Sequence, residues 1–278
     1  MRASPPRESQ VFTEARPTVE PRHSIRARAV SVRGDQIVKT QEPGQSRRER
    51  LRTLAGRVVG EQTGLFVVPE IVAFDDARGE TVFERLPLTD LHGALADPVR
   101  SVEMAGRSAE VLAAIHGLMQ RPGDARSHPG GLGIDPQREL VPLHGDFALT
   151  NVLYLSASDQ LAVIDWSNAE WTGVDADLGA PEIDVGVFLI SLFHRRLLGR
   201  QPVASRHRVA RHFLARYASL GPHGLDSEML RGFVTGITPA FVRMTRRLKG
   251  PMRALAFRHS MVDLAYFLRG LAPKPTRR

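Results

Sequence analysis

Residues 144–151 read HGDFALTN, and residues 164–166 read IDW. Together they contain two carboxylates and one carboxamide, from Asp146, Asp165 and Asn151. Mg²⁺ prefers hard oxygen ligands and usually takes only one or two of them from a protein, the others coming from phosphates and water. We therefore predict that the three side chains handle Mg²⁺ and a phosphoryl group. Each one alone could be a turn, cap or strand-end residue, so the prediction depends on their joint occurrence.

The segment between the two motifs has the pattern of a β-hairpin. Residues 152–155 favour a strand, residues 156–160 are turn formers, and residues 161–164 are a second apolar run. Folding this hairpin returns Asp165 to the neighbourhood of Asn151. Both side chains can then face one cation.

The spacing Asp146-x-x-x-x-Asn151 is that of a kinase catalytic loop, in which the Asp orients a substrate hydroxyl and the Asn holds a metal. With IDW at this separation, the motifs resemble those of the aminoglycoside phosphotransferase and choline kinase superfamily, and a fainter likeness covers residues 24–270. The resemblance implies an α+β, protein-kinase-like fold with a small β-rich N-lobe and a larger, mostly helical C-lobe. It implies that Asp146 and His144 are catalytic and that Asn151 and Asp165 bind the metal. Taken alone, His144 could equally be a core histidine.

The chain divides into three expected parts. Residues 1–21 are expected to be a flexible tail, residues 22–88 a nucleotide-binding N-lobe, and residues 89–278 a C-lobe with the catalytic loop and substrate-binding helices. Apolar periodicity predicts the helices of the C-lobe. They are expected near residues 102–119, 184–198, 204–220, 227–248 and 252–271.

Lysines are scarce, because only Lys39, Lys249 and Lys274 occur. Lys39 lies in a strand-like run, residues 36–40. Residues 33–35, just before it, have the pattern of a hairpin turn. The position matches the phosphate-holding lysine that the resemblance implies. The alternative is an exposed lysine on an edge strand.

Two further positions are assigned by the resemblance. Residues 81–87 resemble the hinge of the family, where the backbone groups of Glu84 and Leu86 would pair with the base of the nucleotide. Asp184 matches an aspartate that braces the catalytic loop, and the alternative is a simple helix N-cap.

The ion-pair partner of Lys39 is less obvious. A helix is expected from Ser46 to about Val59, with Gly60 ending it. Glu49 is the leading candidate for the partner and Glu42 the second. Glu49 lies nearly opposite the apolar stripe of this helix, so a shifted helix would be needed. The apolar residues at helical spacing are Leu51, Leu54, Ala55, Val58 and Val59.

The N-lobe departs from the family in one respect. Residues 22–33 contain no glycine, so no glycine-rich loop precedes Lys39. Ser24, Arg26 or Arg28 could cover the phosphates instead, although an ordinary strand face is the simpler interpretation.

Composition limits the class of protein. The chain has 278 residues, no cysteine and a net charge of +8 that comes almost entirely from arginine. The absence of cysteine excludes disulfides, thiolate nucleophiles and cysteine-zinc sites. No apolar run is long enough for a membrane span, and residues 1–22 lack a secretory signal. A cytoplasmic enzyme is expected. The arginines are dispersed and aromatic residues are few, which disfavours a dedicated nucleic-acid reader.

These observations predict a Mg²⁺-dependent phosphotransferase that moves the γ-phosphate of ATP or GTP to a hydroxyl of a small molecule, such as an antibiotic or metabolite. Two alternatives stay open. One is a kinase acting on Ser or Thr of a peptide in modified-peptide biosynthesis, and the other is a non-catalytic kinase-like binding protein.

Charge bears on the acceptor. The acidic residues after the metal motif would suit a cation, and they are Glu170, Asp175, Asp177, Glu182 and Asp184. From Arg195 onward arginine dominates, with Asp226, Glu228 and Asp263 as the only acids. That region disfavours a polycationic drug and favours a phosphorylated, acidic or neutral hydroxyl compound. Solvated arginine faces are the alternative.

Overall fold

The computed structural model describes most of the chain. It covers residues 29–87, 91–97, 100–121, 125–127, 132–135, 137–167, 176–194, 203–222 and 224–271. The expected tail at residues 1–21 lies outside these ranges, as do Ser24, Arg26, Arg28, Glu170 and Asp175.

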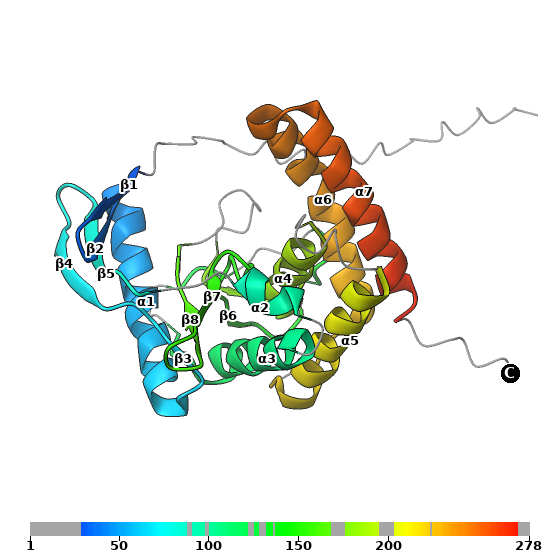
Figure 1. Cartoon of the computed structure of the whole chain (residues 1–278), viewed down its shortest axis with the longest axis horizontal. Coiled ribbons are helices and arrows are strands. Elements are labelled where there is room, and N and C mark those ends of the chain that lie inside the picture. Colours follow the sequence, from blue (N-terminus) through cyan, green and yellow to red (C-terminus); the bar gives the residue numbers. More distant parts are fainter. Residues whose placement is uncertain are drawn as a thin grey trace, which may run out of the picture.

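The N-lobe is an antiparallel sheet with one long helix beside it (Figure 1). Its strands are β1 (Ala29–Arg33), β2 (Gln36–Thr40), β4 (Ile71–Asp75) and β5 (Glu80–Glu84), in the order β1-β2-β5-β4. The expected turn joins β1 to β2, where Gly34 has a φ of +62° that favours glycine. Because β2 pairs with a strand on each side, Lys39 lies on an interior strand.

Helix α1 (Pro43–Thr63) is longer than expected at both ends. Pro43 occupies the first turn, where its missing N–H costs nothing, and Ser46 is therefore inside the helix. Gly60 does not end it. The helix ends at Gly64, whose left-handed φ of +67° lets its N–H bond the carbonyl of Gly60.

Only part of the predicted apolar stripe of α1 packs into the core, namely Ala55 and Val59. Leu51, Leu54 and Val58 are 43%, 46% and 44% exposed. The helix turns its other face toward residues 143–144, whose buried carbonyls need polar partners. The buried residues are Ser46, Glu49, Arg52, Thr53, Gly56, Val59 and Gly60.

The predicted hairpin is confirmed. Strands β7 (Val152–Leu155) and β8 (Gln160–Val163) pair antiparallel around a turn in which Asp159 has a φ of +51°. Strand β3 (Phe66–Val67) follows α1 and pairs in parallel with β8, which ties the two lobes together. A pairing not anticipated joins β6 (Val141–Pro142) to β9 (Leu178–Gly179).

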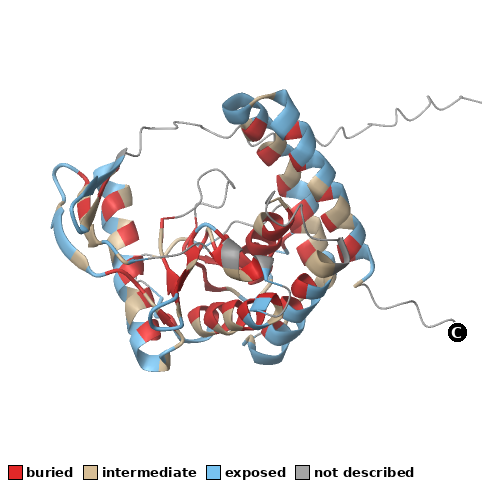
Figure 2. Cartoon of the chain, viewed as in Figure 1, coloured by how far each residue is buried: buried red, intermediate tan, exposed pale blue. Residues whose placement is uncertain are grey.

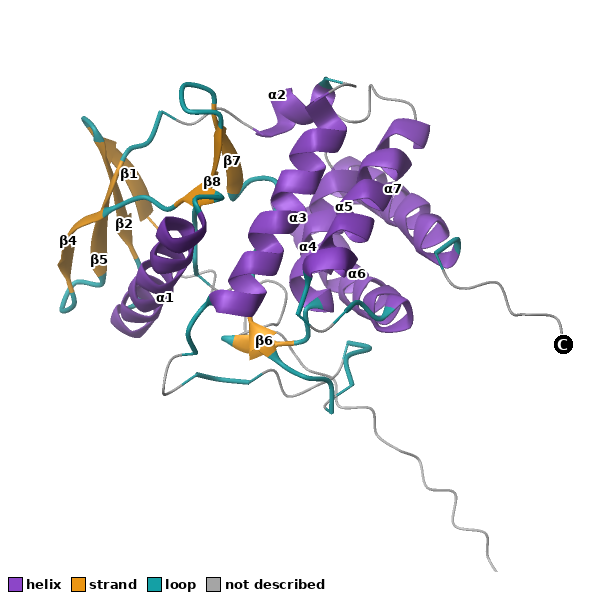
Figure 3. Ribbon diagram, turned by 90° about the horizontal axis from the view of Figure 1, so that it is seen from below, coloured by secondary structure: helices purple, strands orange, loops and turns teal. Residues whose placement is uncertain are grey.

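The C-lobe is a helical assembly around α4, on the right of Figure 3. Its helices are α2 (Leu91–Ala96), α3 (Arg100–Leu118), α4 (Glu182–His194), α5 (Val203–Leu220), α6 (Ser227–Lys249) and α7 (Pro251–Arg269). Buried residues concentrate in α4 and the central hairpin, whereas most residues of the N-lobe sheet are intermediate or exposed (Figure 2). Within the described ranges, no helix has the length and apolarity needed to cross a bilayer. The expected two-lobe α+β fold is confirmed.

Helix α1 packs closely on the tryptophan of the IDW motif, which generates a stability prediction. A Cβ atom at Gly56 would come within 2.3 Å of the Trp166 ring. Because Trp166 is only 1% exposed and has no room to yield, Gly56→Ala should lower the free energy of unfolding by about 1–3 kcal/mol. Urea denaturation measures this.

Gly117→Ala is the matched control, because it makes the same change in helix α3 with no atom within 4 Å of the new methyl. It should be neutral or stabilising by up to about 1 kcal/mol. Equal effects of the two substitutions would contradict the close contact with Trp166.

Candidate active site

The backbone before Asp146 is held by a buried carboxylate. Asp184, in the first turn of α4, accepts hydrogen bonds from the N–H of His144 (2.7 Å) and of Gly145 (2.8 Å). Gly145 has a φ of +83°, which an L side chain rarely adopts. The geometry therefore gives Asp184 the contacts of the expected brace.

Asp184 stays ionised although it is completely buried. Burial alone raises its pKa, but the hydrogen bond from His116 Nε2 (3.1 Å), the electrostatic interactions with His116 and His144 and the backbone N–H of His144 outweigh it and hold the pKa below its ordinary value. Because His116 donates through Nε2, its Nδ1 accepts the hydroxyl of Tyr217 at 2.7 Å when the ring is neutral. A buried chain of polar groups thus supports the loop from α3 and α5.

Asn151 orients Asp146. Its Nδ2 donates to the backbone oxygen and to Oδ2 of Asp146, both at 2.9 Å. This turns the amide oxygen of Asn151 away from Asp146. The carbonyl of Asn151 also accepts the N–H of Ile164 at 2.9 Å, so the hairpin returns Asp165 beside the loop as predicted.

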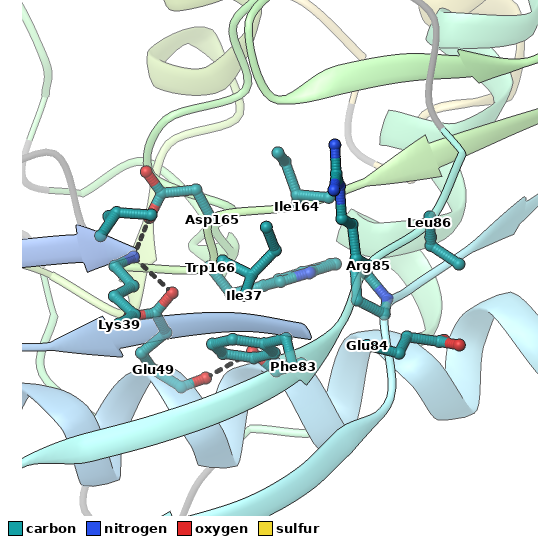
Figure 4. Close-up of a pocket in the computed structure, with 13 residues that line it drawn as sticks. Ile37, Lys39, Glu49, Phe83, Glu84, Arg85, Leu86, Ile164, Asp165 and Trp166 are labelled. Atoms are coloured by element: carbon teal, nitrogen blue, oxygen red, sulfur yellow. Dashed lines mark hydrogen bonds and ion pairs between the residues drawn. The ribbon is translucent and has the colours of Figure 1, made fainter. Parts of the chain in front are cut away.

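Lys39 lies between two carboxylates, as Figure 4 shows. Its Nζ is 2.7 Å from Glu49 Oε1 and 2.6 Å from Asp165 Oδ1. Gln41 and Ser167 add hydrogen bonds to Glu49 and Asp165 respectively. Burial lowers the pKa of Lys39, but the two carboxylates more than compensate and raise it above its ordinary value. The structure thus brings Glu49, and not Glu42, to Lys39.

The backbone of Asp165 has a φ of +57°, which is uncommon for a residue other than glycine. Such conformations persist where surrounding contacts over-determine them, and here Lys39 and Ser167 hold the carboxylate.

Within the described residues no group of three or more His, Cys, Asp or Glu could bind a metal. The predicted ligands Asn151 and Asp165 would give a cation two protein ligands, a number that suits Mg²⁺.

His144 was predicted to be catalytic, and its surroundings are those of a positioning residue. The ring is fully buried against Phe147 and Trp166. Its Nε2 lies 3.2 Å from the carbonyl of Ile164, and its Nδ1 accepts the N–H of Asp146 at 3.3 Å. Burial lowers its pKa to about 4, so the ring is neutral at pH 7 and Nε2 carries the proton.

Arg52 is a residue that the sequence interpretation missed. It is completely buried on α1, and its Nη2 donates to the carbonyls of Leu143 and of His144, the latter at 2.7 Å. Its Nη1 lies 3.8 Å from Asp177 Oδ1. The helical spacing of Glu49, Arg52 and Thr53 indicates a buried polar face of α1. Apolar periodicity instead predicts that the opposite face, with Leu51 and Leu54, is buried.

A cavity of about 370 Å³ lies between the N-lobe sheet and the IDW motif (Figure 4). Lys39, Glu49 and Asp165 line one end, and Glu84 and Leu86 line the other. Glu84 is fixed to Glu70, because its N–H and carboxylate bond the backbone of Glu70 at 2.9 and 2.8 Å. The remaining walls are mainly apolar: Val30, Ile37, Pro69, Phe83, Ile164 and Trp166.

A second cavity, of about 750 Å³, begins at Asp146 and extends between α4, α6 and α7. Asp146 thus borders this second cavity and is hydrogen-bonded to Asn151. Asp165 borders the first cavity. Asn151 connects the two linings, because its side chain bonds Asp146 and its carbonyl accepts the N–H of Ile164, which lines the first cavity.

Comparisons with known proteins bear on this geometry. No protein-family model matches the sequence, and neither does any curated protein. Solved structures do match. Glucosamine kinase in complex with glucosamine, ADP and inorganic phosphate aligns over 87% of this chain and 81% of its own, with a TM-score of 0.60 and 16% identity.

Two aminoglycoside phosphotransferases align similarly. The aminoglycoside-3'-phosphotransferase of type VIII has a TM-score of 0.53 and 17% identity, over 74% of this chain and 84% of its own. APH(3'')-Id from Streptomyces rimosus, in complex with ADP and streptomycin, has a TM-score of 0.50 and 16% identity, over 74% of this chain and 87% of its own. The fold is that of the aminoglycoside phosphotransferases. At these identities the likeness shows the fold alone, so the chemistry of this chain must be argued from its own residues.

The neutral, buried His144 generates a pH prediction. Its pKa is lowered from 6.5 to about 4, so the unfolded chain binds a proton at this histidine before the folded chain does. Stability is therefore lost as the pH falls from 6.5 to 4, by at most about 3 kcal/mol from this group. Urea denaturation at pH 6.5, 5.5 and 4.5 should show a weaker pH dependence for His144→Asn than for the wild type. His259→Asn, at an exposed histidine, is the control. An unchanged pH dependence in His144→Asn would contradict the prediction.

The contacts of Arg52 generate a second prediction. Arg52→Met keeps the volume but leaves the carbonyls of Leu143 and His144 and the carboxylate of Asp177 without this donor. We expect the free energy of unfolding to fall by about 3–5 kcal/mol, as for other broken buried charge networks. Arg47→Met, at an exposed position on α1, should change it by less than about 0.5 kcal/mol. A loss below about 1 kcal/mol for Arg52→Met in urea denaturation would contradict this role.

Proposed function

We propose that this chain is a phosphotransferase that moves the γ-phosphate of a nucleoside triphosphate, ATP or GTP, to a hydroxyl of a small molecule. The observation that carries the proposal is that Asn151 bonds both Asp146, which borders the second cavity, and Ile164, which lines the first cavity together with Lys39 and Asp165. Nucleotide binding is assigned to the N-lobe, residues 22–88, and acceptor binding to the C-lobe, residues 89–278.

The first cavity suits a nucleotide. Its apolar walls can enclose a base, and Glu84 and Leu86, the residues expected to pair with the base through their backbone, line the end away from Lys39. Lys39 would hold the phosphates at the other end, as a kinase lysine does. The pairing of Lys39 with Glu49 supports this, because a paired lysine is fixed in place and remains charged. Glucosamine kinase and APH(3'')-Id, which have a similar fold, have been solved with ADP.

The donor set fits Mg²⁺. The amide oxygen of Asn151 and the carboxylate of Asp165 are hard oxygen ligands on adjacent segments, and together they match the small number that Mg²⁺ takes from protein. When bound, the ion neutralises phosphate charge. Asn151 and Asp165 would therefore hold the ion, and Lys39 would keep the Asp165 carboxylate in position.

Asp146 is placed to act on the acceptor. Asn151 fixes its Oδ2, and the carboxylate borders the second cavity, so a hydroxyl compound there would meet a positioned base. The acceptor oxygen attacks the γ-phosphorus, the bond to the β-phosphate oxygen breaks, and the hydroxyl proton passes to Asp146. Orientation and charge neutralisation, more than covalent chemistry, then supply the rate.

The test separates chemistry from nucleotide binding. Asp146→Asn keeps the shape of the side chain and removes the base, so it should reduce phosphate transfer or nucleotide hydrolysis by more than about 10²-fold. It should keep the thermal shift that Mg-ATP or Mg-GTP produces. Asp165→Ala should lose that shift. Both measurements use the full chain with and without Mg²⁺.

Asp76→Ala is the control, since Asp76 forms an exposed pair with Arg50 and should leave both readouts unchanged. A wild-type rate in Asp146→Asn would refute the assigned base. A wild type that neither Mg-ATP nor Mg-GTP stabilises would refute the proposed function.

A further inference from the structure

The second cavity has an unusual charge pattern for a site that opens on a catalytic carboxylate. Its floor is apolar, from Ile190, Phe193, Phe241 and Phe257. Helices α6 and α7, which run side by side on the right of Figure 1, form much of its wall. With a volume of about 750 Å³ it has the size of a small-molecule site.

The charged groups that line this cavity are almost all basic. They include the cations Arg206, Lys249 and Arg253, together with two imidazoles, those of His194 and His259. Among the described residues lining the cavity, Asp146 is the only one with a carboxylate.

The cations differ in how far they are neutralised. Arg206 has a counter-ion, because its Nη2 lies 3.3 Å from Asp263, which also contacts His207 at 3.1 Å. Lys249 and Arg253 form no ion pair within the described part of the chain. Two positive charges, at the end of α6 and the start of α7, thus face the cavity without a counter-charge.

This pattern selects against amines. An acceptor with ammonium groups would bring like charge toward Lys249 and Arg253, whereas an anion would form charge-assisted hydrogen bonds with both. Glucosamine, bound in the glucosamine kinase structure, carries an amine. Similar folds with low identity host different substrates, so that ligand does not transfer to this cavity.

We propose that the acceptor is an anionic alcohol, a small hydroxyl compound whose phosphate or carboxylate is held by Lys249 and Arg253 while its hydroxyl faces Asp146. The inference rests on the proposed phosphotransferase function and names its substrate class. In the reaction the acceptor oxygen bonds the γ-phosphorus, the nucleoside diphosphate leaves with the electron pair of the broken bond, and Asp146 takes the proton. The small volume favours this acceptor over a peptide.

Calorimetry on the full chain with saturating Mg-ADP tests the charge preference, because the nucleotide then occupies the first cavity. The probes share one carbon frame: glucose 6-phosphate, gluconate, glucose and glucosamine. We expect one or both anions to bind at least tenfold more tightly than glucose, and glucosamine to bind least. The two anions distinguish a phosphate from a carboxylate. Preference for glucosamine, or no binding by either anion, would overturn the inference.

Charge reversal locates the effect. Lys249→Glu/Arg253→Glu should weaken binding of the preferred anion at least tenfold. Arg247→Glu/Arg258→Glu is the matched control, because it makes the same change of net charge at exposed positions on the same two helices outside the cavity lining. The control should change affinity by less than about twofold. Equal losses would mean that bulk charge, not the cavity, attracts the anion, and would overturn the inference.

Turnover separates this inference from the proposed function. With Mg-ATP, phosphate transfer to the preferred anion at a higher kcat/KM than to glucose or glucosamine supports both. Transfer to glucosamine alone, or to an acidic serine-containing peptide alone, keeps a phosphotransferase and overturns the anionic small-molecule acceptor. If charge reversal removes anion binding but the wild type shows neither transfer nor nucleotide hydrolysis, the charge preference of the cavity is supported. The catalytic assignment is then refuted.

Discussion

The ammonium group of Lys39 holds the two halves of the site together. It lies between Glu49 on α1 and Asp165 after β8, at 2.7 and 2.6 Å. Removing these charges from water is costly, and their mutual attraction compensates only if the geometry is close and every group keeps a partner. The sheet, α1 and the returning hairpin must therefore adopt one arrangement for the first cavity to exist. Loss of the lysine would leave two carboxylates facing each other, which disfavours ionisation of both.

The segment before Asp146 is fixed from two sides. Arg52 donates hydrogen bonds to the carbonyls of Leu143 and His144. Asp184 accepts hydrogen bonds from the N–H groups of His144 and Gly145. The donors and acceptors come from different helices, α1 and α4, so the segment cannot move without breaking buried hydrogen bonds on one side. Such bonds are costly to leave unmade. Preorganisation of Asp146 thus follows from the backbone contacts more than from its own side chain.

The sequence predicted what depends on local pattern. The hairpin, the neighbourhood of Asn151 and Asp165, and the C-lobe helices follow from strand runs, turn residues and helical periodicity. The face of α1 did not follow, because apolar periodicity assumes that the apolar face is buried. Here a polar stripe is buried instead, since the catalytic segment presents carbonyls that Arg52 must satisfy. Partners 91 and 92 residues apart leave no local signal.

The two cavities differ in charge, and this difference links the fold to its chemistry. At the Lys39 end of the first cavity one ammonium lies between two carboxylates, an arrangement that would suit a cation accompanied by phosphates. Among the described residues that line the second cavity, Lys249 and Arg253 form no ion pair and Asp146 has the only carboxylate. A positive field there would attract an anionic acceptor and repel amines, so the cavity would select by charge rather than by shape. The cations lie on α6 and α7, whereas the proposed metal ligands Asn151 and Asp165 flank the hairpin. On the proposed function, acceptor choice could therefore vary on this scaffold while the proposed site of phosphoryl transfer stays unchanged.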